Sequence, residues 1–322
     1  MQYAFIINYF ADTKKRQKTE AEIETLSKRL PGQVFRHVTE HPGHAGELAR
    51  MYADQFKEDG IVIALGGDGT VHEVSNALAF TKTPMAVVPL GTGNDFARSV
   101  LPEELFEHPE EIIRRLDTHK IRPIDMMRVT PFDKEGCPIP GSSSLSVNIT
   151  SFGLDTAVQA RAKEIVARAR KSRWIRRNAY TLAIISCLLR GWNFKMRYTL
   201  RLFDGTEVSD RLSYCLACIS NGRYYGNGFH PSPQGLTDDG ILEATIVEDM
   251  PLYKVLPLVP KYKKGTHLGH PRIRSFQIIQ CEIASDNPDT PLRGNYEGED
   301  FEGASVQIEV VPGALSFAFF SI

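Results

Sequence analysis

The chain lacks the features of a fibrous, disordered or membrane-spanning protein. Its 322 residues are 42% hydrophobic and 24% charged, which excludes a largely disordered protein, a collagen-like repeat and a heptad rod. No internal repeat and no low-complexity linker interrupts the sequence. The longest mostly apolar stretch, residues 180–189, is too short to cross a bilayer and is closed by Arg190. No basic segment precedes a long apolar core near the start, so we expect no signal peptide.

An excess of charge and a regular cysteine pattern are also missing. Lys and Arg number 38 against 39 Asp and Glu, so we expect no chain-wide electrostatic attraction to nucleic acid. The five cysteines are irregularly spaced. Cys215 and Cys218 form a C-x-x-C pair within a predicted strand, where residues three apart point to opposite faces, so we predict buried structural thiols. We therefore expect a soluble protein of a reducing, cytoplasmic compartment.

The first third of the chain alternates strand and helix patterns. Because these units repeat, they predict a parallel sheet with helices on both sides, that is, a three-layer α/β domain. The strands are predicted at residues 4–8, 34–38, 61–65 and 85–89, and the helices at 18–30, 45–56, 71–79, 94–100 and 109–116.

Strand patterns dominate from about residue 121 onward and predict an antiparallel β domain. Turn signals such as Asp204-Gly205 and Pro312-Gly313 separate several of the strands. Two helical segments, at residues 156–189 and 252–264, interrupt the pattern. The predicted strands are residues 124–129, 144–149, 194–202, 212–220, 241–247, 273–283, 306–311 and 315–320.

A glycine-rich segment joins the third predicted strand to the following helix. It consists of Gly66-Gly67-Asp68-Gly69-Thr70, and a turn of this kind at the carboxyl end of a parallel strand lets backbone N–H groups approach a phosphate. Asp68 has the wrong charge to attract a phosphate, but it suits a Mg²⁺ ion that bridges phosphates. The same residues would also suit a tight turn in which Asp68 and Thr70 cap the helix.

A second loop repeats this arrangement after the fourth strand. It reads Pro89-Leu90-Gly91-Thr92-Gly93-Asn94-Asp95-Phe96-Ala97-Arg98. Both loops open at the carboxyl edge of the sheet, where open α/β sheets bind ligands. Thr92 can donate a hydrogen bond to a phosphate, and Asp95 suits capping or the orientation of a substrate hydroxyl. The two loops together predict that the domain binds nucleotide phosphates.

The two loops resemble those of the diacylglycerol kinase catalytic family, which includes bacterial soluble lipid kinases and sphingosine kinases. A lone Gly-Gly-Asp-Gly-Thr also occurs in NAD kinases and phosphofructokinase-like enzymes, whereas the full order of motifs is specific. The resemblance covers nearly the whole chain and continues through residues 148–155, 221–228, 236–242 and 264–267.

The resemblance implies an ATP-dependent lipid phosphotransferase with two domains and an active site in the cleft between them. Residues 1–123 plus 312–322 would form the ATP-binding α/β domain, to which the last strand returns. Residues 124–311 would form a β-sandwich domain for the lipid substrate. The residues implied to line ATP are Asn8, Thr39, Gly66, Gly67, Asp68, Gly69, Thr70, Gly91, Thr92, Asn94 and Asp95.

The resemblance also implies catalytic acids and a metal-binding loop. Glu299, in the place of the family's D-G-E motif, would accept the proton of the lipid hydroxyl, and Glu297 would orient it. Gly298 between them would permit a sharp backbone that aims both acids into one cleft. On a regular strand the two carboxylates would share a face, and the repulsion between them would raise one pKa. A structural Mg²⁺ would take the Asp239 carboxylate and the carbonyl oxygens of Leu236 and Ile241. Without the resemblance, residues 297–300 would suit an exposed acidic turn.

Two departures from the family pattern leave alternatives open. The family's N-P-x-x-G is here Asn8-Tyr9-Phe10-Ala11-Asp12, without the proline and glycine, and Glu297 is one methylene longer than the usual aspartate. We favour an ATP-dependent kinase of a lipid hydroxyl, in diacylglycerol or a related lipid. The alternatives are a kinase of a soluble polyol or NAD, and a nucleotide-binding regulator without catalysis.

A basic segment runs from Arg161 to Arg177 and holds eight Lys and Arg residues against one acid, Glu164. With Trp174 among them, this pattern is typical of peripheral contact with an anionic membrane, where the lipid substrate would be met. A solvated arm or a homodimer contact explains it equally well. A second basic cluster, Lys261, Lys263 and Lys264, is open to the same roles.

Overall fold

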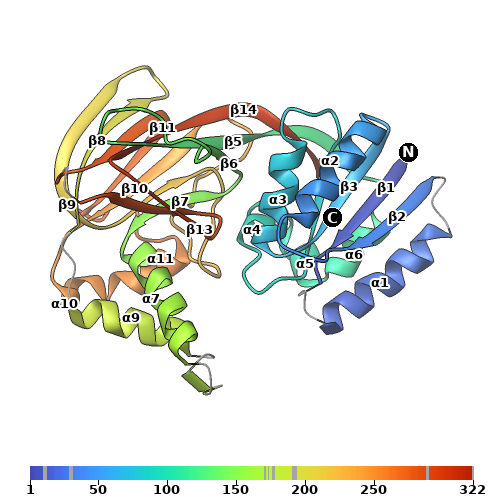
Figure 1. The fold of residues 1–322 in the computed structure, drawn as a ribbon, viewed down its shortest axis with the longest axis horizontal. Coiled ribbons are helices and arrows are strands. Elements are labelled where there is room, and N and C mark those ends of the chain that lie inside the picture. Colours follow the sequence, from blue (N-terminus) through green and yellow to red (C-terminus); the bar gives the residue numbers. More distant parts are fainter. Residues whose placement is uncertain are drawn as a thin grey trace.

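The computed structural model describes residues 1–9, 13–28, 32–169, 172, 174–175, 178–190, 194–287 and 290–320. They form two domains that lie side by side and are joined by long strands (Figure 1).

The first domain is built on a parallel sheet in the order β4-β3-β1-β2. Every residue of β3 and β4 is buried, because helices cover both faces. Helices α2 and α3 pack together on one face, and α1 and α6 lie on the other (Figure 1). The predicted three-layer α/β domain is thus confirmed. Its elements are β1 (Gln2–Ile7), α1 (Thr13–Ser27), β2 (Gln33–Val38), α2 (His44–Phe56), β3 (Gly60–Gly66), α3 (Asp68–Leu78), β4 (Met85–Pro89), α4 (Asp95–Val100), α5 (Glu103–Glu107) and α6 (Pro109–Arg114).

The second domain is antiparallel and sandwich-like, as predicted. Its strands curl around a hydrophobic core, and four helices form a layer beneath them (Figure 1). The strands are β5 (Lys120–Phe132), β6 (Ser144–Ser146), β7 (Ile149–Gly153), β8 (Phe194–Leu202), β9 (Glu207–Ser220), β10 (Leu242–Glu248), β11 (Ile273–Ser285), β12 (Leu292–Tyr296), β13 (Glu299–Gly303) and β14 (Ser305–Phe319). The helices are α7 (Leu154–Arg168), α9 (Ala179–Arg190), α10 (Leu252–Val255) and α11 (Leu258–Lys264).

Two paired strands, β5 and β14, cross between the domains. β14 pairs with β11 near its start and reaches β4 near its end, where Phe317 lies opposite Met85, so the predicted return of the last strand is confirmed. The predicted turn at Pro312-Gly313 is wrong, because the register of β14 against β5 shifts there without ending the strand. Gly313 adopts φ 61° and donates its N–H to Asp125 (2.8 Å). The proposed domain limits fall inside these strands and stay a prediction.

The Cys215–Cys218 pair lies on β9, as predicted, but both side chains contact the core on the α11 side. The register against β10 shifts at this point, so the alternation of faces is broken. Cys215 packs in the cluster with Tyr262, and the Cys218 thiol lies 3.5 Å from the Tyr262 hydroxyl. Burial raises the pKa of Cys215 to about 12 and also raises that of Cys218, which fits the predicted structural role of both thiols.

Candidate active site

The two glycine-rich loops lie against each other at the carboxyl ends of β3 and β4. The N–H groups of Leu90 and Gly91 donate to the Gly66 carbonyl at 2.9 and 3.2 Å. A Cβ atom at Gly91 would overlap the backbone of Gly67, so only glycine allows this close approach. The sequence predicted that both loops open at one edge, and the structure brings them into direct contact.

Asn94 fixes the conformation of the second loop. It adopts the left-handed conformation with φ 56°, which asparagine tolerates better than most residues. Its side-chain oxygen accepts a hydrogen bond from the Gly91 N–H, and its amide donates to the Gly91 carbonyl, both at 2.9 Å. Thr92 stays exposed on the loop, where its hydroxyl is available to a ligand.

The end of β1 closes the other side of the first loop. The Asn8 amide donates to the Thr70 hydroxyl at 2.7 Å, and Thr39 accepts from the Tyr9 N–H at 3.2 Å. The structure therefore gathers the residues predicted around ATP at one edge of the sheet. Of the altered loop after β1, Phe10, Ala11 and Asp12 lie outside the described residues.

Asp68 and Asp95 form an acidic pair beneath these loops. A Cβ atom at Gly93 would lie 2.9 Å from Asp68 Oδ2 and 3.4 Å from Asp95 Oδ2, so the two carboxylates flank Gly93. Burial, followed by the charge of Asp95, raises the pKa of Asp68 to about 6. The Phe96 N–H donates to Asp68 at 3.3 Å and offsets part of this effect. A cation placed here would favour the ionised form of both acids.

Asp95 also joins the two domains, which the sequence did not predict. Its carboxylate accepts hydrogen bonds from the backbone N–H groups of Asn227 at 2.9 Å and Gly228 at 2.8 Å. A second contact lies nearby, where the Arg223 N–H donates to the Ser99 hydroxyl at 2.9 Å. The segment of residues 221–228, one of the motifs on which the family resemblance depends, is thus fixed against α4.

The two glutamates of the acidic motif occupy different positions in a tight hairpin. Glu297 and Gly298 have φ values of 49° and 90°, and Tyr296 pairs with Glu299, so residues 297 and 298 form a two-residue turn between β12 and β13. The expectation that the two carboxylates lie side by side on a regular strand is therefore wrong. Turn geometry decided the outcome, and a strand-period argument does not apply within a turn.

Glu297 turns inward and Glu299 stays exposed. The Glu297 carboxylate accepts hydrogen bonds from the Ser146 hydroxyl at 2.7 Å and the Asn148 N–H at 2.8 Å. Burial, followed by the charge of Asp68, raises the pKa of Glu297 to about 7. Glu299 lies close enough to His72 to raise its pKa, although burial lowers that pKa more strongly. Since Asp68 and His72 both belong to the start of α3, the turn of the second domain faces the first glycine-rich loop.

The predicted metal loop contains two acids, Asp238 and Asp239, and a third acid, Asp125 of β5, lies beside it. Asp239 accepts from the Ile241 N–H at 3.0 Å, and burial, followed by the charges of Asp125 and Asp238, raises its pKa. Asp125 accepts from the Gly240 N–H at 2.7 Å. Within the described residues, no group of three or more His, Cys, Asp or Glu side chains is arranged to hold a metal, so Leu236 and Ile241 carbonyls or water would have to complete any site.

Sequence reasoning gave no role to an apolar pocket beneath the β domain. It has a volume of about 160 Å³ and lies between α7, β9 and the helices α9 to α11. Asp155 is the one acid among the described residues of its wall, and burial raises the pKa of this carboxyl to about 7. Tyr225, Gly226 and Phe229 also line the pocket, and they come from the loop that is bonded to Asp95. One loop therefore contacts both the pocket and the candidate active site.

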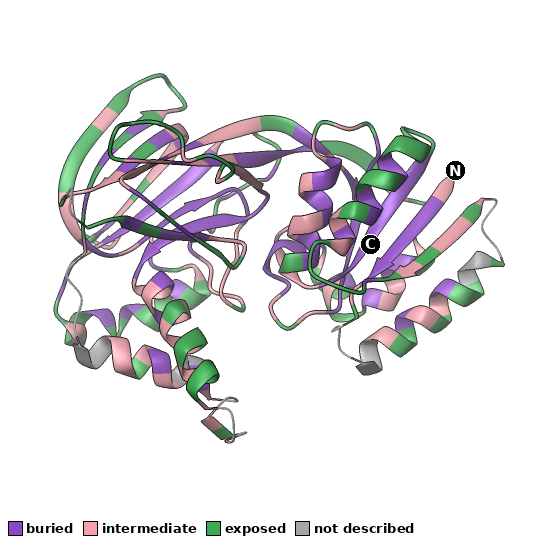
Figure 2. Cartoon of the chain, viewed as in Figure 1, coloured by how far each residue is buried: buried purple, intermediate pink, exposed green. Residues whose placement is uncertain are grey.

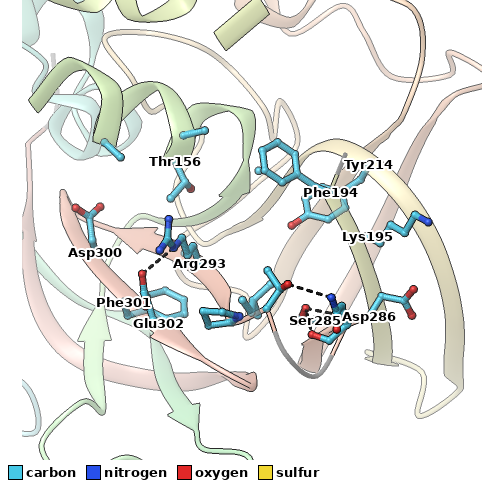
Figure 3. Close-up of a pocket in the computed structure, with 18 of the residues that line it drawn as sticks. Thr156, Phe194, Lys195, Tyr214, Ser285, Asp286, Arg293, Asp300, Phe301 and Glu302 are labelled. Atoms are coloured by element: carbon cyan, nitrogen blue, oxygen red, sulfur yellow. Dashed lines mark hydrogen bonds and ion pairs between the residues drawn. The ribbon is translucent and has the colours of Figure 1, made fainter. Parts of the chain in front are cut away.

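A larger cavity, of about 1000 Å³, lies at the end of the β domain (Figure 3). Thr156 and Phe301 flank one side of it, and Phe194 and Tyr214 the other. Arg211 and Asp286 form an ion pair in its wall. None of the predicted site residues is among the described residues that line it, and we assign it no role in catalysis.

The fold and the site together define a phosphotransferase: two contacting glycine loops at a sheet edge, with acids of both domains directed toward them. Comparison with known proteins supports this class. Residues 2–129 match the diacylglycerol kinase catalytic domain, and residues 148–319 match the YegS C-terminal NAD kinase beta sandwich-like domain.

Relatives with similar sequences are named as probable lipid kinases. "Probable lipid kinase YegS-like" of Xanthomonas axonopodis pv. citri is 30% identical over 277 residues, which is 83% of this chain and 82% of that protein. "Probable lipid kinase YegS" of Escherichia coli is 29% identical over 281 residues, which is 84% of this chain and 82% of that protein. The chain therefore belongs to the diacylglycerol kinase catalytic family and is a lipid kinase, a transferase with an alcohol group as acceptor.

Solved structures agree at the level of the fold. A diacylglycerol kinase from Bacillus anthracis superposes with a TM-score of 0.65 at 18% identity, covering 99% of this chain and 97% of that one. A second structure from the same organism gives a TM-score of 0.70 at 20% identity with the same coverage. Among the described helices, none is long and apolar enough to span a membrane.

Proposed function

We propose that this lipid kinase transfers the γ-phosphoryl group of ATP to a hydroxyl group of diacylglycerol or a related lipid. The observation that carries the proposal is the contact between the Gly66–Thr70 and Gly91–Asp95 loops, which carry Asp68 and Asp95 and lie close to Glu297 of the second domain. Backbone N–H groups of such loops and the start of α3 suit the phosphates of a nucleotide. Asn8, Thr39, Thr70 and Thr92 lie around the same edge.

Asp68 and its neighbours fit a divalent cation. The carboxylates of Asp68 and Asp95 flank one glycine, and both have raised pKa values. Two negative charges this close are unfavourable unless a cation offsets them. Mg²⁺ bound there would neutralise charge on the phosphoryl oxygens. Asp68 would hold the ion, and Asp95 would keep the second-domain loop in place. The acids around Asp239 fit a second, structural cation for the same electrostatic reason.

The Glu297-Gly298-Glu299 turn would supply the proton acceptor. Glu297 is held by Ser146 and Asn148, which suits a residue that positions the turn. Glu299 is exposed toward the start of α3, where a substrate hydroxyl can reach it. We therefore keep Glu299 as the acceptor and Glu297 as the residue that positions it. A lipid hydroxyl needs such a base because it is a weak nucleophile at neutral pH.

The apolar pocket supports a lipid acceptor over a soluble one. Its lining is almost entirely hydrophobic, and it lies one loop away from Asp95. A pocket of this kind suits part of an acyl chain, whereas a polyol or a dinucleotide would need polar partners in it. The soluble acceptors remain useful as competitors in the test.

The test is an acceptor panel with γ-labelled ATP and Mg²⁺, containing diacylglycerol, other lipids with free hydroxyls, polyols and NAD. We expect label in one or more lipids and none in NAD or polyols. Glu299→Gln should abolish transfer while leaving ATP binding intact, and Glu297→Gln should weaken it less. Label in NAD or a polyol instead of a lipid would overturn the proposal, and so would ATP binding without transfer to any acceptor.

A further inference from the structure

The helix pair α10–α11 has an unusual exposed side. Val255, Leu258 and Tyr262 are buried and pack in a small core cluster. The remaining side is exposed and carries large apolar groups, with Tyr253 69% exposed, Leu256 51% and Val259 43%. Residues 252–264 contain no acid at all. The exposed basic residues among them are Lys254, Lys261, Lys263 and Lys264.

Two of these exposed apolar groups also belong to the wall of the apolar pocket. Leu256 and Val259 line the pocket and are also accessible to solvent. Ile184 of α9 also lines it, and the next residue, Ile185, is 49% exposed. In Figure 1, α9, α10 and α11 lie together beneath the β domain, away from the α/β domain. The wall of the pocket therefore includes exposed apolar groups of a helix pair that also carries four exposed lysines.

The lysines of this surface are not neutralised within the described part of the chain. None of the four forms an ion pair there. The basic helix α7 differs, because Arg161 pairs with Glu164 at 2.7 Å and Lys163 pairs with Asp300. Of the predicted anchor Arg161–Arg177, residues 170, 171, 173, 176 and 177 lie outside the described residues.

We propose that the exposed side of α10–α11 docks on an anionic lipid bilayer, with Tyr253, Leu256 and Val259 in the interface and the pocket opening toward the lipid. The proposal rests on the lipid-kinase function proposed above. Apolar groups with lysines and no acids are the composition that binds an anionic membrane surface. The exposed apolar groups continue into the apolar pocket, and this favours a bilayer over an acidic protein as the partner. A lipid could then pass from the bilayer into the pocket without crossing water.

The test measures binding to two kinds of vesicle, phosphatidylcholine alone and phosphatidylcholine with a third of phosphatidylglycerol. The charge variant is Lys254→Gln with Lys261→Gln, and the apolar variant is Tyr253→Ser. Lys28→Gln with Lys134→Gln and Met51→Ser are matched controls, exposed on other parts of the molecule. We expect the charge variant to lose about fivefold in affinity for anionic vesicles per lysine, and Tyr253→Ser to weaken binding as well.

Both variants should keep wild-type activity on a water-dispersed, short-chain diacylglycerol. Unchanged vesicle binding by both variants would overturn the proposal, and so would equal losses in the controls or equal binding of the wild type to neutral vesicles. Loss of short-chain activity in parallel with vesicle binding would also contradict it. Vesicle binding needs no turnover, so failure of the proposed kinase reaction would be seen separately, as wild-type binding without transfer.

Discussion

Glu297→Gln offers a direct test of the electrostatics of the acidic turn. Glutamine can still accept the hydrogen bonds from Ser146 and Asn148, but it cannot ionise. The pKa of Glu297 rises from an ordinary 4.5 to about 7 through burial and the charge of Asp68. Each pKa unit corresponds to about 1.4 kcal/mol, so the ionised side chain costs the folded state about 3 kcal/mol.

The sign follows from which state holds the proton. Between about pH 4.5 and pH 7 the folded protein keeps the Glu297 proton and the unfolded chain releases it, so the free energy of unfolding falls as pH rises through this window. The Glu297→Gln variant has no such ionisation, so it lacks this loss of stability. Its stability relative to the wild type should increase with pH by up to about 3 kcal/mol and level off above pH 7.

The assay is urea unfolding followed by circular dichroism from pH 4 to pH 8, without nucleotide or divalent cations. Glu282→Gln, an exposed position on β11, shows the effect of removing one surface carboxylate. A difference between Glu297→Gln and the wild type that does not change with pH would refute the reasoning. It would mean that the Glu297 carboxylate is solvated in the folded protein.

Three further predictions follow from the site. Asp68→Asn should lower turnover roughly a hundredfold or more while the protein stays folded. The control Asp54→Asn, which changes an exposed acid of α2, should leave turnover unchanged. Wild-type turnover in the Asp68 variant would mean that Asp68 only caps the helix. Gly91→Ala should lower the free energy of unfolding by about 1–3 kcal/mol because its Cβ meets the Gly67 backbone. Gly69→Ala is the control, because a Cβ at Gly69 meets no other atom. Comparable stability of the two variants would argue against the loop contact. Asp155→Asn should increase stability relative to the wild type progressively between pH 4 and pH 7, because burial raises the pKa of Asp155 to about 7; thermal melts across this range check it, and a pH-independent difference would contradict it.

Periodic patterns predicted the first domain well. Buried parallel strands such as β3 and β4 are continuous apolar runs, and the glycine loops follow directly from them. The position of each loop at the carboxyl edge follows from the β-α-β connection alone. What the sequence could not show is how closely the loops approach, because the contact between Gly91 and Gly67 depends on the spacing of the two strands.

Bulges and turns account for the errors in the second domain. The shift in β14 at Pro312-Gly313 looks like a turn in the sequence, yet the pairing with β5 continues beyond it. The strands β12 and β13 were missed because both are short and glycine-containing, and the Glu297-Gly298 turn between them sets the direction of the two acids. A register shift in β9 moved Cys215 to the face of Cys218.

Contacts between the domains could not be predicted from the sequence. Asp95 was expected beside the nucleotide, and its bonds to Asn227 and Gly228 join segments more than 130 residues apart. Ser146 gave no signal at all, although it holds Glu297. Such contacts depend on the relative placement of two domains, which local patterns do not encode.

The most direct test of the central claim compares two labels of ATP. The protein is incubated with Mg²⁺, diacylglycerol in mixed micelles and ATP labelled at either the γ- or the α-phosphate, and the lipid is then extracted into organic solvent. The account predicts that γ-label enters the organic phase with the wild type and not with Asp68→Asn, while α-label stays in water. It would be contradicted if γ-label remained in water for the wild type, or entered the lipid equally with Asp68→Asn.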